Sequence, residues 1–233
     1  MYHSITIGDK NTWDDWHLIP ESRPLVNSPP VKSNYIEIPG GDGVLDLTAV
    51  MAGRPLYHNR TGNWSFIVQN GFRDWAVLYS EIMGYLHGQK LQAVLEDDPD
   101  FYYEGRFSVN QWKSDKDYSR IVIDYNVGPY KQYVAGGNKW LWDTFNFETD
   151  TIRYYKSLIV SGTLDIVVIG DMMDTIPVLV SSVSGMKVTY GSVTHTLSRG
   201  ANQFSDIVLH HGENNFTFTG NGRITINIVG GRL

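Results

Sequence analysis

Residues 35–47 read YIEIPGGDGVLDL, and this stretch decides the kind of fold that the chain forms. Ile36 and Ile38 alternate with polar or mixed positions, and Leu45 and Leu47 repeat the period of two on the return, as strands do. The glycine-rich segment between them lies between two strands, whereas a phosphate-binding loop would need a helix directly after it. The stretch therefore predicts a β-hairpin that carries no chemistry.

Strand patterns continue beyond the hairpin, with one helix among them. The alternation of Trp64, Phe66 and Val68 predicts a strand, and three more strands are expected over 90–96, 101–109 and 119–127. The spacing of three and four predicts a helix over 72–88, with Asn70 as its N-cap and Gly88 at its end, from these residues: Trp75, Leu78, Tyr79, Ile82, Tyr85 and Leu86.

The second half of the chain is a series of short strands behind a linker. Gly128-Pro129 and the glycines at 136 and 137 bracket the linker. We therefore expect domains at 1–133 and 151–233, joined by a linker at 134–150. Eight strands of this spacing are typical of a sandwich or jelly roll, and they are expected at 152–160, 164–169, 177–183, 186–190, 193–197, 205–210, 214–219 and 223–229.

Bulk composition excludes several classes of protein. The net charge of -6 and the lack of a Lys/Arg cluster argue against nucleic acid as the main partner. The chain has no cysteine, which excludes disulfides and thiolate metal sites. The longest apolar run, near 166–169, is too short to span a bilayer, so we expect no membrane insertion. Charged residues at 19% and aromatics at 13% suit a surface buried against partners, although a β-rich domain alone also explains the aromatics.

Two patterns leave other functions open. Glu96, Asp97, Asp98 and Asp100 could bind a metal or act as the acid and base of a polysaccharide hydrolase, but solvated acids are ordinary in such a turn. A carbohydrate-binding module would use exposed aromatic rings, for which the loop tryptophans are candidates, although an interface uses them equally well: Trp13, Trp16, Trp112, Trp140 and Trp142. No nucleophile elbow, P-loop, zinc-binding helix or dinucleotide fingerprint is present, so we expect no enzyme, no catalytic residue, no cofactor and no metal.

Short motifs in a particular order carry a family resemblance. The chain resembles the distal tail proteins (the Dit family) of long-tailed phages that infect Gram-positive bacteria, over about residues 1–133. The motifs are WDDWHLIP at 13–20, SRP at 22–24, IPGGDG at 38–43, LDLT at 45–48, YHNRTG at 57–62, YLHG at 85–88, LEDDP at 95–99, YEGRF at 103–107 and WKSD at 112–115. Weaker likeness lies in ENNFTFTGNG at 213–222 and GGRL at 230–233.

The resemblance implies a fold and a role. The fold is mainly β: an N-terminal β-sandwich or split-barrel-like domain with one α-helix and a long hairpin, then a C-terminal galectin-like or jelly-roll β-sandwich. Six copies form a homo-hexameric ring at the virion tail tip, made in the host bacterial cytoplasm, which joins the tail tube protein to the tail-tip hub protein of the baseplate. The outer domain can carry receptor-binding proteins, and DNA passes the channel without specific binding. A carbohydrate-binding module for host-surface adhesion is the alternative.

A ring requires a heterologous contact that closes on itself, and a long hairpin can supply it. We therefore hypothesise that region 38–57 contacts the adjacent subunit. The candidate interface residues are Ile38, Leu45, Leu47, Leu56 and Tyr57.

Overall fold

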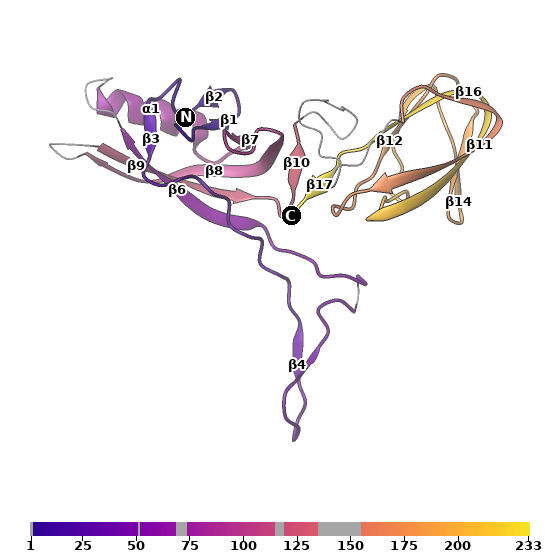
Figure 1. Ribbon diagram of the computed structural model, residues 1–233, viewed down its shortest axis with the longest axis horizontal. Coiled ribbons are helices and arrows are strands. Elements are labelled where there is room, and N and C mark those ends of the chain that lie inside the picture. Colours follow the sequence, from indigo (N-terminus) through magenta and orange to yellow (C-terminus); the bar gives the residue numbers. More distant parts are fainter. Residues whose placement is uncertain (1, 51, 69–73, 115–118, 135–154) are drawn as a thin grey trace. The chain divides into compact units, whose positions relative to one another are not determined.

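The computed structural model describes residues 2–50, 52–68, 74–114, 119–134 and 155–233. These residues are mainly β with a single helix, as Figure 1 shows. They form two compact units, Met1–Lys131 with Leu233, and Gln132–Arg232. The expected linker at 134–150 lies outside the described residues except for Val134, so its bounds stay a prediction.

The first unit contains an antiparallel sheet with the strand order β2-β1-β7-β8-β9-β6-β3. Its strands are β1 (Ile5–Ile7), β2 (Lys10–Asn11), β3 (Leu18–Pro20), β6 (Arg60–Val68), β7 (Gln89–Leu95), β8 (Phe101–Ser114) and β9 (Ser119–Val127). The short strands β10 (Lys131–Tyr133) and β17 (Gly231–Arg232) pair with each other. The strands expected at 64–68, 90–96, 101–109 and 119–127 are confirmed, and β8 continues beyond its expected end.

One helix, α1 (Trp75–Leu86), packs into the core of this unit. Leu78, Ile82 and Leu86 are fully buried, and each contributes about 2 kcal/mol by leaving water. The expected N-cap, Asn70, lies outside the described residues, and the helix is capped by Asp74, whose carboxylate accepts the N–H of Ala76 at 2.9 Å. The C-terminal end agrees with the sequence, because the glycine that follows the C-cap residue His87 has a φ of +75°.

The hairpin at 35–47 is confirmed, and it forms a separate two-stranded sheet. Strands β4 (Tyr35–Glu37) and β5 (Val44–Asp46) pair through Ile36 and Leu45, among others. Gly40 and Gly43 turn the chain with φ values of +76° and +80°, which a residue with a Cβ rarely adopts. Every residue of both strands is exposed to solvent.

The second unit is one curled antiparallel sheet. Its strands are β11 (Leu158–Gly170), β12 (Val178–Ser181), β13 (Lys187–Tyr190), β14 (Val193–Thr196), β15 (Gly200–Asn202) and β16 (Gly212–Asn227). Along β16, β11 pairs on one side over its whole length, whereas β13 and then β12 pair on the other side. The sheet therefore divides partway along β16 and folds over a core of its own, which includes Phe216, Phe218, Ile224 and Ile226. This is the expected sandwich-type arrangement.

Glycines explain why the structure has two long strands where the sequence predicts four shorter ones. The sequence predicts breaks near Gly162 and Gly220, but these residues lie opposite each other in register, with φ values of +78° and +124°. They bend the β11–β16 ribbon without ending it. The expected strand at 205–210 is wrong, since that segment makes only the isolated bridge between Thr175 and Leu209, and β15 was not expected.

Candidate subunit interface

The β4–β5 hairpin and the segments that lead to it form an arm, which we define as residues 31–50 and 52–57. Backbone hydrogen bonds close its base: the Lys32 N–H donates to the Leu56 carbonyl at 2.8 Å, and the His58 N–H donates to the Pro30 carbonyl at 2.8 Å. Figure 1 shows β4 standing apart from the strands of the larger sheet in this unit. The arm therefore begins and ends at one point of the first unit.

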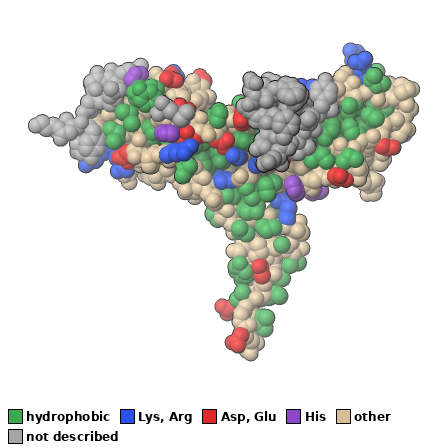
Figure 2. All heavy atoms as spheres, in the orientation of Figure 1, with side chains coloured by type: hydrophobic (Ala, Val, Ile, Leu, Met, Phe, Trp, Pro, Cys, Tyr) green, Lys and Arg blue, Asp and Glu red, His purple; other side chains and the backbone are tan. Residues whose placement is uncertain are grey.

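The arm exposes an unusual number of apolar side chains. Their exposed fractions lie between 38% and 68%, and they are Val31, Tyr35, Ile36, Ile38, Val44, Leu45, Val50 and Leu56. Figure 2 shows hydrophobic side chains distributed along the arm, with a few acidic ones toward its tip. A two-stranded hairpin is marginally stable in water, and so many exposed apolar side chains on one element mark a contact with another molecule.

The structure places the five candidate residues in two groups on the arm. Ile38 and Leu45 are half-exposed on the hairpin itself, and Leu45 lies opposite Ile36. Leu47, Leu56 and Tyr57 lie nearer the base, where the Leu47 N–H donates to the Asn34 carbonyl at 2.8 Å. The Tyr57 ring packs edge-on against Tyr130, with the ring centroids 6.2 Å apart. The side chains of Leu47 and Tyr57 are only partly exposed.

Sequence reasoning missed five exposed apolar residues of the arm: Val31, Tyr35, Ile36, Val44 and Val50. The alternation of the hairpin assigns Ile36 and Ile38 to one face, which predicts one buried face and one exposed face. In the structure both faces are exposed. The usable signal was the presence of apolar residues on both faces of a two-stranded element.

Arg60 binds the segment that leads into the arm through hydrogen bonds. Its side chain is 5% exposed, its Nε donates to the Pro129 carbonyl at 2.8 Å, and its Nη1 donates to the Asn27 carbonyl at 3.0 Å. Burial lowers the pKa of this guanidinium, which also lies over the Tyr103 ring. Arg60 thereby joins the segment that enters the arm to the end of β9.

The face of the large sheet that turns away from the core is polar, and it carries charges of both signs. Its residues include Asn63, Ser65, Ser108, Asn110, Asp124 and Asn126, which lie on the adjacent strands β6, β9 and β8. Lys90 pairs with Glu104, and Arg120 pairs with Glu21 at 2.7 Å. The Asn110 amide donates to Asp124 at 3.1 Å. The side chains of this face are therefore mostly polar or charged.

The acidic run at 96–100 does not converge on one point. Glu96 accepts the Ser4 N–H at 2.8 Å, and Asp98 accepts from the Lys131 ammonium at 2.7 Å. Asp97 accepts from Arg23 at 2.8 Å and lies 2.9 Å from His3; the Arg23 hydrogen bond is the main cause of its lowered pKa. Within the described ranges, no group of three or more His, Asp or Glu side chains could hold a metal.

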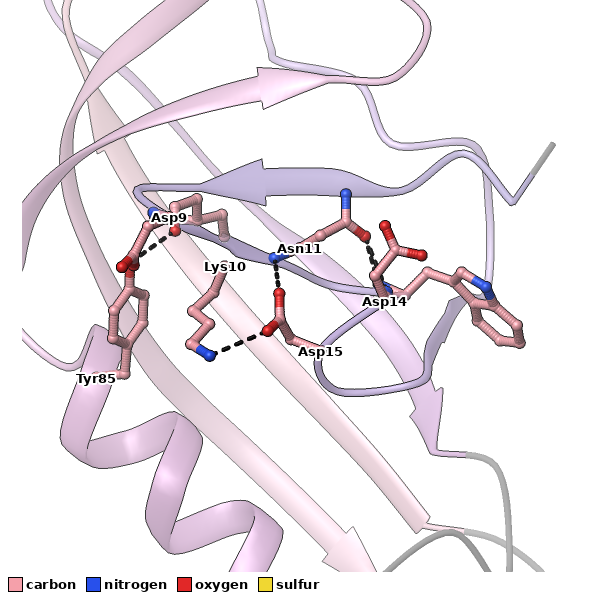
Figure 3. Close-up of polar contacts among 8 residues, drawn as sticks. Asp9, Lys10, Asn11, Asp14, Asp15 and Tyr85 are labelled. Atoms are coloured by element: carbon pink, nitrogen blue, oxygen red, sulfur yellow. Dashed lines mark hydrogen bonds and ion pairs between the residues drawn. The ribbon is translucent and has the colours of Figure 1, made fainter.

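The motif at 13–20 builds a turn, as Figure 3 shows. The Asp15 carboxylate accepts the Asn11 N–H at 2.7 Å and the Lys10 ammonium at 3.0 Å. The Asn11 side chain accepts the N–H groups of the two residues after Thr12, and the Tyr85 hydroxyl donates to Asp9. These contacts tie the β1–β2 hairpin to α1.

The candidate tryptophans among the described residues do not gather on one surface. Trp16 is fully buried, and Trp13 stacks on Tyr2 with the ring centroids 3.8 Å apart. Trp112 is half-exposed and packs against Tyr79. The remaining two candidates, Trp140 and Trp142, lie outside the described residues.

In the described part of the chain no helix is long and apolar enough to cross a bilayer.

Comparison with known proteins finds a likeness among solved structures. No family model matches the chain, and no curated protein is similar to it in sequence. Among solved structures it is similar to the Dit protein (gp 19.1) of phage SPP1, described as a paradigm of the hub adsorption apparatus in phages that infect Gram-positive bacteria. The TM-score is 0.61 over 99% of each chain, at 12% sequence identity. The chain therefore has a Dit-like fold over its whole length.

Proposed function

We propose that the protein is a structural component of a phage tail tip, a distal tail protein whose six copies form a ring between the tail tube and the tail-tip hub. The exposed apolar arm carries this proposal, and the Dit-like fold supports it. The role is one of assembly and involves no chemical reaction. The protein would be made in the host bacterial cytoplasm and would act in the virion.

The arm has the properties that a closed ring requires. In a ring, each copy presents one surface and receives a different one, so a protruding element can reach the next copy. Eight apolar side chains of the arm are at least one-third exposed. Covering each of them would contribute about 1 kcal/mol, before the entropy lost on association is subtracted.

The polar sheet face suits the wall of a channel. Its Asn and Ser side chains are uncharged, two of its cations are paired with carboxylates, and the chain as a whole carries a net charge of -6. Phosphate binding needs clustered, available Lys and Arg side chains. We assign this face to the channel, where DNA would pass without specific binding.

The second unit is the part available for further partners. It has a core of its own, independent of the arm and of the polar face. We propose that it faces outward, where receptor-binding or other baseplate proteins dock. A carbohydrate-binding module for host-surface adhesion remains the alternative, and it predicts quenching of tryptophan fluorescence by cell-wall polysaccharide.

Leu45→Asp tests the ring. We expect the unaltered protein to give six-copy particles in native mass spectrometry, with the tube and hub proteins added if the chain alone does not assemble. A carboxylate at position 45 would be buried at the contact, so L45D should give no six-copy particles, with an unchanged circular dichroism spectrum.

The matched control is Val77→Asp, which changes an apolar side chain that is 60% exposed on α1, outside the arm. V77D should retain the six-copy particle. Rings formed by L45D as readily as by V77D would refute the assignment of the arm to the subunit contact.

A further inference from the structure

A long strand with an open edge borders the sheet of the second unit. Strand β11 runs for 13 residues, and among the described strands it pairs with β16 alone. The other edge strands of this unit, β14 and β15, have four and three residues. A long open edge presents a row of unpaired N–H and C=O groups and is a template for another strand.

Two hydrogen bonds show which residues of β11 face the open side. The Gly162 N–H points toward β16, because it donates to the Asn221 side chain at 3.1 Å. The Ile169 N–H points away from β16, because it donates to the Tyr155 hydroxyl at 2.9 Å. Backbone direction alternates along a strand, so the odd-numbered residues direct both N–H and C=O to the open side.

The open edge lacks the features that usually prevent strands from pairing. Segment 159–167 contains no Pro, Lys or Arg, and its one charge, Asp165, accepts a hydrogen bond from Thr217 at 2.6 Å. Ile159 and Val167 are 67% and 43% exposed. Edge strands that must stay single commonly carry Lys or Pro.

In one antiparallel register, the outward-facing residues of β11 are complementary to the same residues of a second copy. A two-fold axis at Thr163 places Ile159 opposite Val167 of a second copy and Ser161 opposite its Asp165. The two exposed apolar residues then cover each other, and each carboxylate meets a hydroxyl. An axis at Asp165 would instead set two carboxylates opposite each other, which is unfavourable.

We propose that β11 pairs with β11 of a second copy of this chain about an axis at Thr163, so that the two curled sheets become continuous. Five cross-chain pairs of odd-numbered residues would form about ten backbone hydrogen bonds. The bend at Gly162 lies beside the axis and is therefore repeated symmetrically in both copies. This two-fold contact uses a different surface from the arm and does not depend on the proposed ring.

The absence of cysteine allows a direct test with the full chain. In Thr163→Cys the new thiols would face each other across the axis, with Cα atoms about 5.5 Å apart, a distance that a disulfide spans. In the control Ser161→Cys the two thiols would be displaced by four residues, about 13 Å along the strands, and could not join.

After mild oxidation, non-reducing gels should show a disulfide-linked dimer of T163C that forms about tenfold faster than any dimer of S161C. The double variant Thr163→Cys with Leu45→Asp should cross-link equally well, which separates this contact from the ring. Equal cross-linking of T163C and S161C, or none in either, would overturn the proposal.

Discussion

Asp15 shows how a single side chain of the 13–20 motif contributes to the fold. Its carboxylate accepts from the Asn11 N–H first and from Lys10 second, and both hydrogen bonds hold its pKa below the ordinary value. A lowered pKa in the folded state means that the ionised carboxylate stabilises the fold. This stabilisation is complete above the unfolded pKa of 3.8 and is lost as the pH falls through the folded value.

Asp15→Asn should therefore lower the free energy of unfolding by about 1 kcal/mol at pH 7, a modest figure because the side chain is 31% exposed. The difference from the unaltered protein should begin to shrink as the pH falls below the unfolded pKa of 3.8, and it should vanish only below the lower pKa of the folded state. Urea unfolding at pH 7 and pH 3.5, followed by tryptophan fluorescence, measures both values. The control is Asp14→Asn, an exposed neighbour; equal effects of D15N and D14N at pH 7 would contradict the argument.

At the scale of the element, strands with unbroken alternation could be predicted and bends could not. The sequence predicts β9 with the bounds that the structure has, because its apolar residues alternate without a glycine. Gly162 and Gly220 predict turns, yet they bend a continuous ribbon, since only the opposite strand shows whether pairing continues through a glycine. The helix start was misplaced because Asn70 and Asp74 are both good caps, and residue type alone does not choose between them.

Replacing two glycines by alanine should give opposite effects. Gly220→Ala should lower the stability of the second unit by about 1–2 kcal/mol, because φ is +124° and a Cβ would lie 3.0 Å from Met186 Cγ. Gly84→Ala should raise the stability of the first unit by up to about 1 kcal/mol, because the helix has open space there. Differential scanning calorimetry of both variants measures the shifts. A destabilised G84A or an unchanged G220A would count against this account of the two positions.

At the scale of the whole molecule, the sequence could predict two β-rich units but not which apolar residues remain exposed. Ile36 and Leu45 have the same alternation as Phe66 and Ile123, which are fully buried. Alternation identifies an apolar face, whereas the covering element depends on distant parts of the chain or on another molecule. The candidate interface was therefore reached through the family resemblance, and the structure adds the exposure that the hypothesis needs.

Assembly should change the protection of the arm more than that of any core strand. In an unassembled chain the backbone amides of β4 and β5 lie on a solvent-exposed two-stranded hairpin, so they should exchange with deuterium within seconds to minutes. In the six-copy ring the neighbouring copy covers the arm, and exchange should slow by about a hundredfold, the factor expected for about 3 kcal/mol of added protection. Peptides from β9, which is buried in both states, provide the internal control. The Leu45→Asp variant, which should form no ring, provides the reference with an uncovered arm under the same conditions. If the arm amides of assembled rings exchanged as fast as those of L45D, the arm would be free in the ring, and the subunit contact would have to lie on another surface.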